Sequence, residues 1–146
     1  MNKLIRYLFF LLITLGWQQS YGQVYKFSTS GFSVLEKNEK GKWGEWSDLE
    51  LSKMMVSLDT NKNRIVIYSQ IIQLFEIVDY LPTTENETDI VYGFTCKDND
   101  GVDCNVSIIT RKKQGNRKQL YLNYGNQIIV YNIFNMDSLG SSMSLM

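Results

Sequence analysis

The chain has 146 residues, of which 44% are hydrophobic and 13% aromatic, enough to form the core of one globular domain. Its 15 basic and 15 acidic side chains balance, so no long-range attraction draws it to nucleic acid or to an anionic membrane surface. Histidine, the commonest general base at neutral pH and a frequent zinc ligand, is absent. The composition disfavours a nucleic-acid partner and lowers the expectation of an enzyme.

Residues 1–22 have the pattern of a secretory signal peptide. Lys3 and Arg6 make a basic start, and a short apolar core follows. Ser20 and Gly22 then place small residues at positions −3 and −1 of a cleavage site. A membrane-spanning helix needs about 20 apolar residues, more than this run provides. We therefore predict cleavage after Gly22.

Cleavage there leaves 124 residues, which we divide into a single β domain over 23–136 and a flexible tail over 137–146. The loss of two basic residues gives this mature chain a net charge of about −2. The first cysteine is Cys96, so none stands beside the apolar core to carry a lipid. We expect a secreted or periplasmic protein with no membrane insertion after cleavage, no nucleic-acid partner and no cofactor.

The rest of the chain alternates short apolar and polar runs separated by Gly, Asn and Asp, which is typical of antiparallel β structure. In the first run, Tyr25 and Phe27 alternate with polar residues, and the phase slips by one at Gly31, to Phe32. A β-bulge at the glycine absorbs the extra residue. We predict one long bent strand over 24–37.

Two later hairpins have registers that the pattern predicts. A turn over 60–63 places Leu58 opposite Ile65, and a two-residue Gly-Asn turn places Leu122 opposite Ile129. About eight strands joined mainly by short hairpins predict an all-β fold. The antiparallel meander forms either a small up-and-down barrel or a strongly curved sheet.

Cys96 and Cys104 flank one of these hairpin loops. A three-residue loop that ends in a left-handed Gly101 places the two cysteines directly opposite each other, on the apolar side of both strands. Because an exported protein meets an oxidising compartment, we predict a disulfide between them. Its loop is short, so it contributes about 2–3 kcal/mol to stability.

The same loop offers an alternative, a calcium site built on Asp98, Asp100 and Asp103, because oxygen-rich turns bind hard cations. The helical calcium-loop pattern needs an acid where Cys96 stands and a glutamate where Ser107 stands. Asp and Asn are also favoured in turns for purely conformational reasons. We therefore expect no metal.

Three aromatic residues are candidates for ligand binding. Trp43 and Trp46 stand three apart, so in an extended chain one fills the core and the other faces solvent. Tyr121 lies in the last hairpin, which is apolar on both faces. Exposed tryptophan and tyrosine rings stack on sugars or apolar ligands. The alternative is that both tryptophans cap the end of a barrel.

No catalytic constellation is visible. The chain has no Gly-x-Ser-x-Gly, Ser-x-x-Lys or paired metal-ligand motif. The basic run over 112–118 is typical of a solvated hairpin tip.

Several segments carry a family resemblance: 42–46, 63–69, 98–101, 120–124 and 130–132. Together they resemble a family of small secreted β proteins encoded by Bacteroidetes and by some of their phages. The glutamine after the cleavage site is also similar to signal peptides of that phylum. The resemblance implies an origin and an export route, and it transfers no activity and no site.

We expect a non-enzymatic exported binding or interaction module, with a protein or a glycan as its partner. One alternative is a small apolar-ligand carrier of the lipocalin type, because an eight-stranded barrel can hold one small ligand. The many large aromatic residues leave such a barrel little room. A phage-encoded inhibitor of a periplasmic protein is a further alternative.

Overall fold

The computed structural model describes residues 2–15 and 22–136, which form one α-helix and ten β-strands. The predicted cleavage site lies partly, and the predicted tail over 137–146 entirely, outside the described residues. Among the described residues, no helix has the length and hydropathy needed to cross a membrane. The elements are α1 (Asn2–Leu15), β1 (Val24–Glu36), β2 (Glu50–Leu51), β3 (Met55–Asp59), β4 (Arg64–Tyr68), β5 (Gln73–Tyr80), β6 (Thr84–Glu85), β7 (Asp89–Lys97), β8 (Asp103–Arg111), β9 (Arg117–Asn123) and β10 (Gln127–Asn135).

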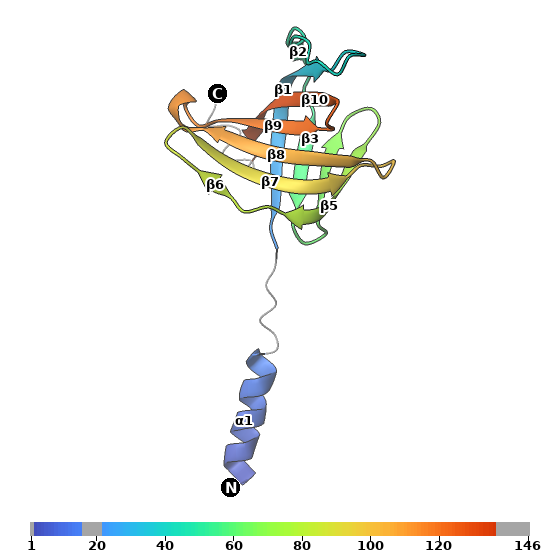
Figure 1. The fold of residues 1–146 in the computed structure, drawn as a ribbon. Helices are drawn as coiled ribbons and strands as arrows, with labels where there is room; N and C mark the ends of the chain where they lie inside the picture. The colour runs from blue at the N-terminus through green and yellow to red at the C-terminus, as the bar shows by residue number, and fades with distance from the viewer. Residues whose placement is uncertain (1, 16–21, 137–146) are drawn as a thin grey trace.

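Eight of the strands form a closed antiparallel barrel (Figure 1). Each barrel strand pairs with the next in chain order, and β10 returns to pair with β1. The two short strands are additions, since β2 pairs with β1 and β6 pairs with β7. The predicted all-β meander of about eight strands is confirmed. Closure by the β1–β10 pairing makes it a barrel and leaves no open curved sheet.

The first strand is long and bulged, as predicted. Its pairing with β10 shifts register between Thr29 and Gly31, so both Phe27 and Phe32 belong to the core side of the strand. A side chain at Gly31 is excluded by close approach, because a Cβ there would stand 2.8 Å from the Glu50 carbonyl oxygen. Glycine therefore lets the segment that leads into β2 lie directly against β1.

The two predicted hairpin registers are confirmed. Leu58 faces Ile65 across β3 and β4, and Leu122 faces Ile129 across β9 and β10. Side chains that alternate inward along all eight strands fill the barrel with one apolar cluster. Its largest fully buried members are Phe75, Ile65, Ile67, Leu120, Leu122 and Ile133. The cluster packs the middle of the barrel and leaves room at one end.

Candidate functional site

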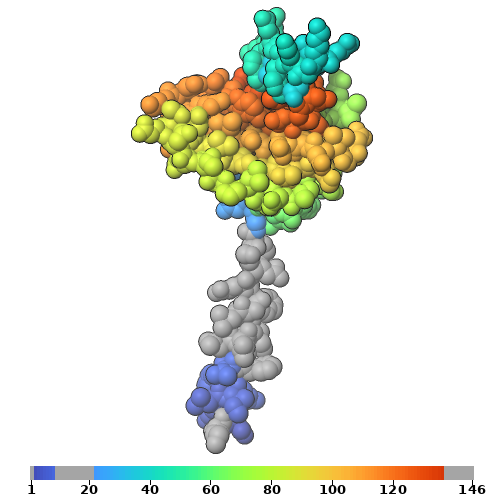
Figure 2. Space-filling model, viewed as in Figure 1, coloured from blue at the N-terminus to red at the C-terminus, as the bar shows by residue number. Residues whose placement is uncertain are grey.

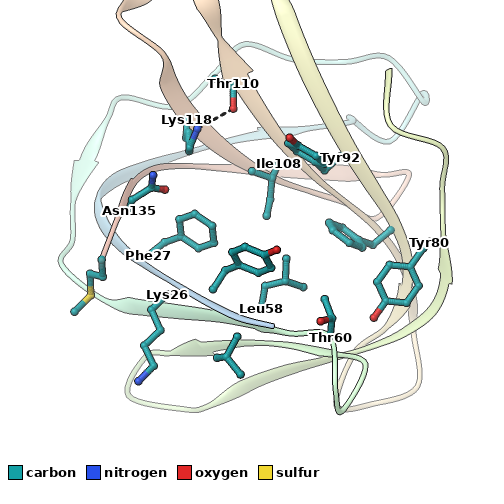
Figure 3. A pocket seen from close by; sticks show the side chains of 14 residues that line it. Lys26, Phe27, Leu58, Thr60, Tyr80, Tyr92, Ile108, Thr110, Lys118 and Asn135 are labelled. Carbon is teal, nitrogen blue, oxygen red and sulfur yellow. Dashed lines mark hydrogen bonds between the residues drawn. The ribbon is translucent and has the colours of Figure 1, made fainter. Parts of the chain in front are cut away.

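A pocket of about 730 Å³ opens at the end of the barrel where β1 begins and β10 ends (Figure 3). Four buried apolar side chains of the core form its floor: Phe27, Leu58, Phe94 and Ile108. Three half-exposed tyrosines line it above them: Tyr25, Tyr80 and Tyr92. The barrel lumen is thus packed in the middle and hollow at one end, which leaves more room than the aromatic content predicts.

A second bulge supplies one wall of the pocket. The pairing of β5 with β7 shifts register between Ile77 and Asp79, so Tyr80 lies opposite Phe94 on the inner face. Their rings meet edge to face at 5.7 Å between centroids. The Tyr80 hydroxyl donates to Asn63 Oδ1 at 2.7 Å. Both contacts hold the Tyr80 ring at the pocket mouth.

Two lysines line this pocket: the exposed Lys26 on β1 and the half-buried Lys118 on the inner face of β9. Lys118 Nζ donates to Thr110 Oγ1 at 3.0 Å, across the β8–β9 pair (Figure 3). Among the described residues, no carboxylate oxygen lies within 4.0 Å of this ammonium group. The pocket therefore combines apolar and aromatic walls with the half-buried Lys118 ammonium group, which has no acidic partner among the described residues, and with the exposed Lys26 of β1.

The prediction that 112–118 is a solvated hairpin tip is wrong for Lys118. Residues 112–114 form a 3₁₀ turn, but β9 begins at Arg117, so Lys118 is already a strand residue. It shares the inward phase of Leu120 and Leu122. The sequence signal for this position is the two-residue period of Leu120 and Leu122, which places Lys118 on the same inner face.

The outer face of the barrel carries a smaller groove of about 350 Å³. The chain between β1 and β2 forms one side of it, and Figure 2 shows this segment, in cyan, projecting from the barrel surface. Two of the three predicted ligand-binding residues, Trp46 and Tyr121, line the groove. The third, Trp43, lies elsewhere, with Lys37 Nζ 4.8 Å from the centre of its ring.

The prediction that one tryptophan fills the core is wrong. Trp43 is 42% exposed and Trp46 is 48% exposed. The reason is that inward side chains of the barrel strands already fill the interior, whereas both tryptophans belong to the outlying segment between β1 and β2.

A hydrogen-bonded network forms the floor of the outer groove. The Arg111 guanidinium donates to Asp89 Oδ1 at 3.0 Å and to Gln119 Oε1 at 3.2 Å. It also donates to the Tyr121 hydroxyl at 3.0 Å. Gln119 Nε2 donates to Asn132 Oδ1 at 3.3 Å. The hydrogen bond to Asp89 raises the pKa of Arg111, so the guanidinium stays charged at any physiological pH.

The predicted disulfide is not formed in this structure, in which Cys96 and Cys104 are free, buried thiols. The predicted register is correct, since the two residues face each other. Asp98 N donates to the Val102 carbonyl at 2.9 Å, and by the alternation of an antiparallel ladder the cysteines are also a hydrogen-bonded pair. Cβ atoms in such pairs stand roughly 5.5 Å apart, beyond the 3.5–4.5 Å of a disulfide.

Two of the three carboxylates of the calcium alternative are engaged elsewhere. Asp98 accepts hydrogen bonds from two backbone amides of its own loop and, at 3.0 Å, from the Tyr124 hydroxyl. Asp103 pairs with Lys97 at 2.8 Å. The described residues contain no group of three His, Cys, Asp or Glu side chains that could hold a metal, so Asp98, Asp100 and Asp103 do not form a calcium cage. Asp98 instead organises the turn.

Replacing Asp98 with asparagine is expected to make the free energy of unfolding change less between pH 7 and pH 3. Partial burial acts to raise the pKa of Asp98, but hydrogen bonds from the loop amides and Tyr124 outweigh it and hold the pKa below its usual value. Since the folded pKa is depressed, the carboxylate stabilises the fold fully above the unfolded pKa of about 3.9, and this contribution is lost as the pH falls through the folded pKa. Urea unfolding of D98N should therefore show a deficit at pH 7 that shrinks near pH 3.

The matched control is Asp100→Asn, in the same loop, because the Asp100 side chain takes part in no hydrogen bond among the described residues. It should match the parent protein at both pH values. An equal deficit of the Asp98 variant at pH 7 and pH 3 would show that its ionisation does not stabilise the turn.

Comparison of the chain with family models, with curated proteins and with solved structures finds no match. The resemblance to secreted proteins of Bacteroidetes and their phages stays a prediction.

Proposed function

We propose that this protein binds one small, largely apolar ligand in the pocket at the open end of its barrel. The observation that carries the proposal is the pocket itself, whose volume of about 730 Å³ lies within the range of about 300–1,000 Å³ typical of small-molecule sites. Its floor is apolar and its walls are aromatic. Of the functions considered from the sequence, the apolar-ligand carrier is therefore the one that the geometry supports best.

The ligand carries an acidic group. The Lys118 ammonium group is half-buried beside apolar side chains, where an anion or hydrogen-bond acceptors stabilise it. Thr110 supplies one acceptor to Lys118, and the remaining N–H donors of the ammonium group have no carboxylate in reach among the described residues. An aliphatic or aromatic carboxylic acid would bury its hydrocarbon part on the pocket floor and pair its carboxylate with Lys118.

Calorimetric titration with decanoate, below the concentration at which it forms micelles, tests the proposal. A chain that begins at Gln23 is suitable, because every barrel strand and every core residue lies within Val24–Asn135. Saturable binding at one site is expected. Decanol should bind more weakly than decanoate to the parent protein, and Lys118→Met should abolish that difference.

A matched pair of substitutions locates the site. Asn135 is exposed at the pocket rim, so Asn135→Trp should fill the mouth without disturbing the core and weaken decanoate binding by about tenfold or more. Asn105→Trp makes the same change on the exposed, outward side of β8 and should leave binding unchanged. Absence of saturable binding, or equal binding by both variants, would refute the proposal.

A further inference from the structure

The outer groove is separate from the pocket. The two share no lining residue, and β9 serves both because its side chains alternate: Lys118 points inward, whereas Arg117 and Gln119 point outward. The groove is mostly polar where the pocket is mostly apolar, so it selects a different kind of molecule. Its chemistry can be derived from three of its parts: an aromatic wall, a pair of amides and an unpaired arginine.

The aromatic wall comes from Trp46, which stays half exposed although it stands over the barrel surface. The segment that carries it is fixed to β1 by hydrogen bonds. Ser47 N donates to the Val34 carbonyl at 2.8 Å, and Val34 N donates to Ser47 Oγ at 2.8 Å. An exposed aromatic ring on a segment that is fixed to a strand offers a large contact face at little entropic cost.

The amides are those of Gln119 and Asn132, on the outer faces of β9 and β10. Gln119 is nearly buried, and its hydrogen bonds to Arg111 and Asn132 hold it in one orientation. Both amide oxygens already accept hydrogen bonds within the protein, so what remains for a ligand are N–H donors, the second one of Gln119 Nε2 and those of Asn132 Nδ2, which sugar hydroxyl oxygens can accept. An aromatic face beside oriented amides matches a sugar ring, which has an apolar face and a polar edge.

The charge comes from Arg117. Arg111 is paired with Asp89, but Arg117 has no carboxylate oxygen within 4.0 Å among the described residues. Its guanidinium has a fork geometry suited to a carboxylate. The groove therefore has one positive charge left for a ligand.

From these parts we infer that the outer groove is a second binding site, specific for an acidic saccharide. A sugar ring stacks on Trp46, its hydroxyl groups bind to Gln119 and Asn132, and its carboxylate pairs with Arg117. The site works independently of the barrel pocket, since neither the residues nor the ligand class are shared.

Titration of the purified protein with trigalacturonate, followed by NMR or calorimetry, tests this inference. Its fully methyl-esterified form is the matched ligand, because it keeps the sugar rings and removes the charges. The parent protein should bind trigalacturonate saturably and the ester at least about tenfold more weakly. Arg117→Met should bring the two ligands to equal affinity, whereas Lys113→Met, an equal loss of charge at an exposed site outside the groove, should not.

Two tryptophan variants test the stacking. Both residues are exposed, so neither substitution should unfold the barrel, which circular dichroism checks. Trp46→Ala should lower the affinity for trigalacturonate at least about tenfold, and Trp43→Ala, outside the groove, should not change it. Equal effects of the two variants, or no saturable binding, would overturn the inference. So would hexaglutamate binding that needs Arg117 but not Trp46, because the groove would then recognise charge alone.

The variants separate this inference from the proposed function. Asn135→Trp fills the pocket and should leave trigalacturonate binding unchanged, whereas Trp46→Ala should leave decanoate binding unchanged. A negative result at one site therefore does not refute the proposal for the other site.

Discussion

Replacement of Phe75 by alanine should lower the free energy of unfolding by about 3–5 kcal/mol, a large part of the 5–15 kcal/mol typical of a small domain. Phe75 is 1% exposed and is the largest fully buried side chain of the core. It faces Ile65 across β4 and β5, inside a barrel that closes on itself. The strands on either side are held by pairing on both edges, so they cannot collapse into the space left behind.

Urea unfolding of the Phe75 variant measures this effect. Phe134→Ala is the matched control, because Phe134 is 50% exposed on the outside of β10 and its removal leaves no interior cavity. Phe134→Ala should lower the free energy of unfolding by no more than about 1 kcal/mol. A loss from the Phe75 variant as small as that of the control would mean that the barrel interior is not close-packed around this ring.

Cys96 and Cys104 should resist alkylation in the native protein and both react once it is unfolded, without any reductant. Burial raises the pKa of each thiol to about 12. At pH 8 roughly one thiol in ten thousand would then be a thiolate, the form that reacts. Labelling with iodoacetamide followed by intact mass should therefore find no adduct on the folded protein and two adducts in urea.

Val102→Cys provides the reference rate, because Val102 is half exposed in the same hairpin. This variant should gain one adduct quickly while folded. Two adducts that form in urea only after reduction would show that the cysteines are joined as a disulfide. The protein would then have to bring their Cβ atoms closer than the hydrogen-bonded pairing allows.

Local pattern was sufficient for much of the fold. The phase slip at Gly31 predicted the bulge in β1, and the turn residues predicted which side chains face each other in three hairpins. These features depend on neighbours along the chain and on the two-residue period of a strand, both of which can be read from the sequence. The close approach of the Glu50 carbonyl oxygen is a second reason why position 31 requires glycine, and this approach cannot be predicted from the sequence.

The candidate sites were only partly predictable. Trp46 and Tyr121 were selected as exposed aromatic residues and lie in one groove, but Trp43 was selected on the same grounds and lies outside it. A small apolar ligand inside the barrel was one alternative, but the position and lining of the pocket were not predicted, because its floor is made from strands that are distant in sequence. Lys118 was assigned to a solvated turn because it belongs to a run of basic residues typical of turns, although the strand already begins at Arg117.

The sequence by itself determined the all-β class, the bulge in β1 and the hairpin registers, because each depends on residues a few positions apart. Only the tertiary structure decided that the meander closes, since β1 and β10 lie almost a full domain apart in sequence and must meet edge to edge. Closure in turn decided the rest: it defines an inside and an outside for every strand. It sends Lys118 into a pocket and its neighbours Arg117 and Gln119 onto the outer face, and it buries the two cysteines that the hairpin register places opposite each other.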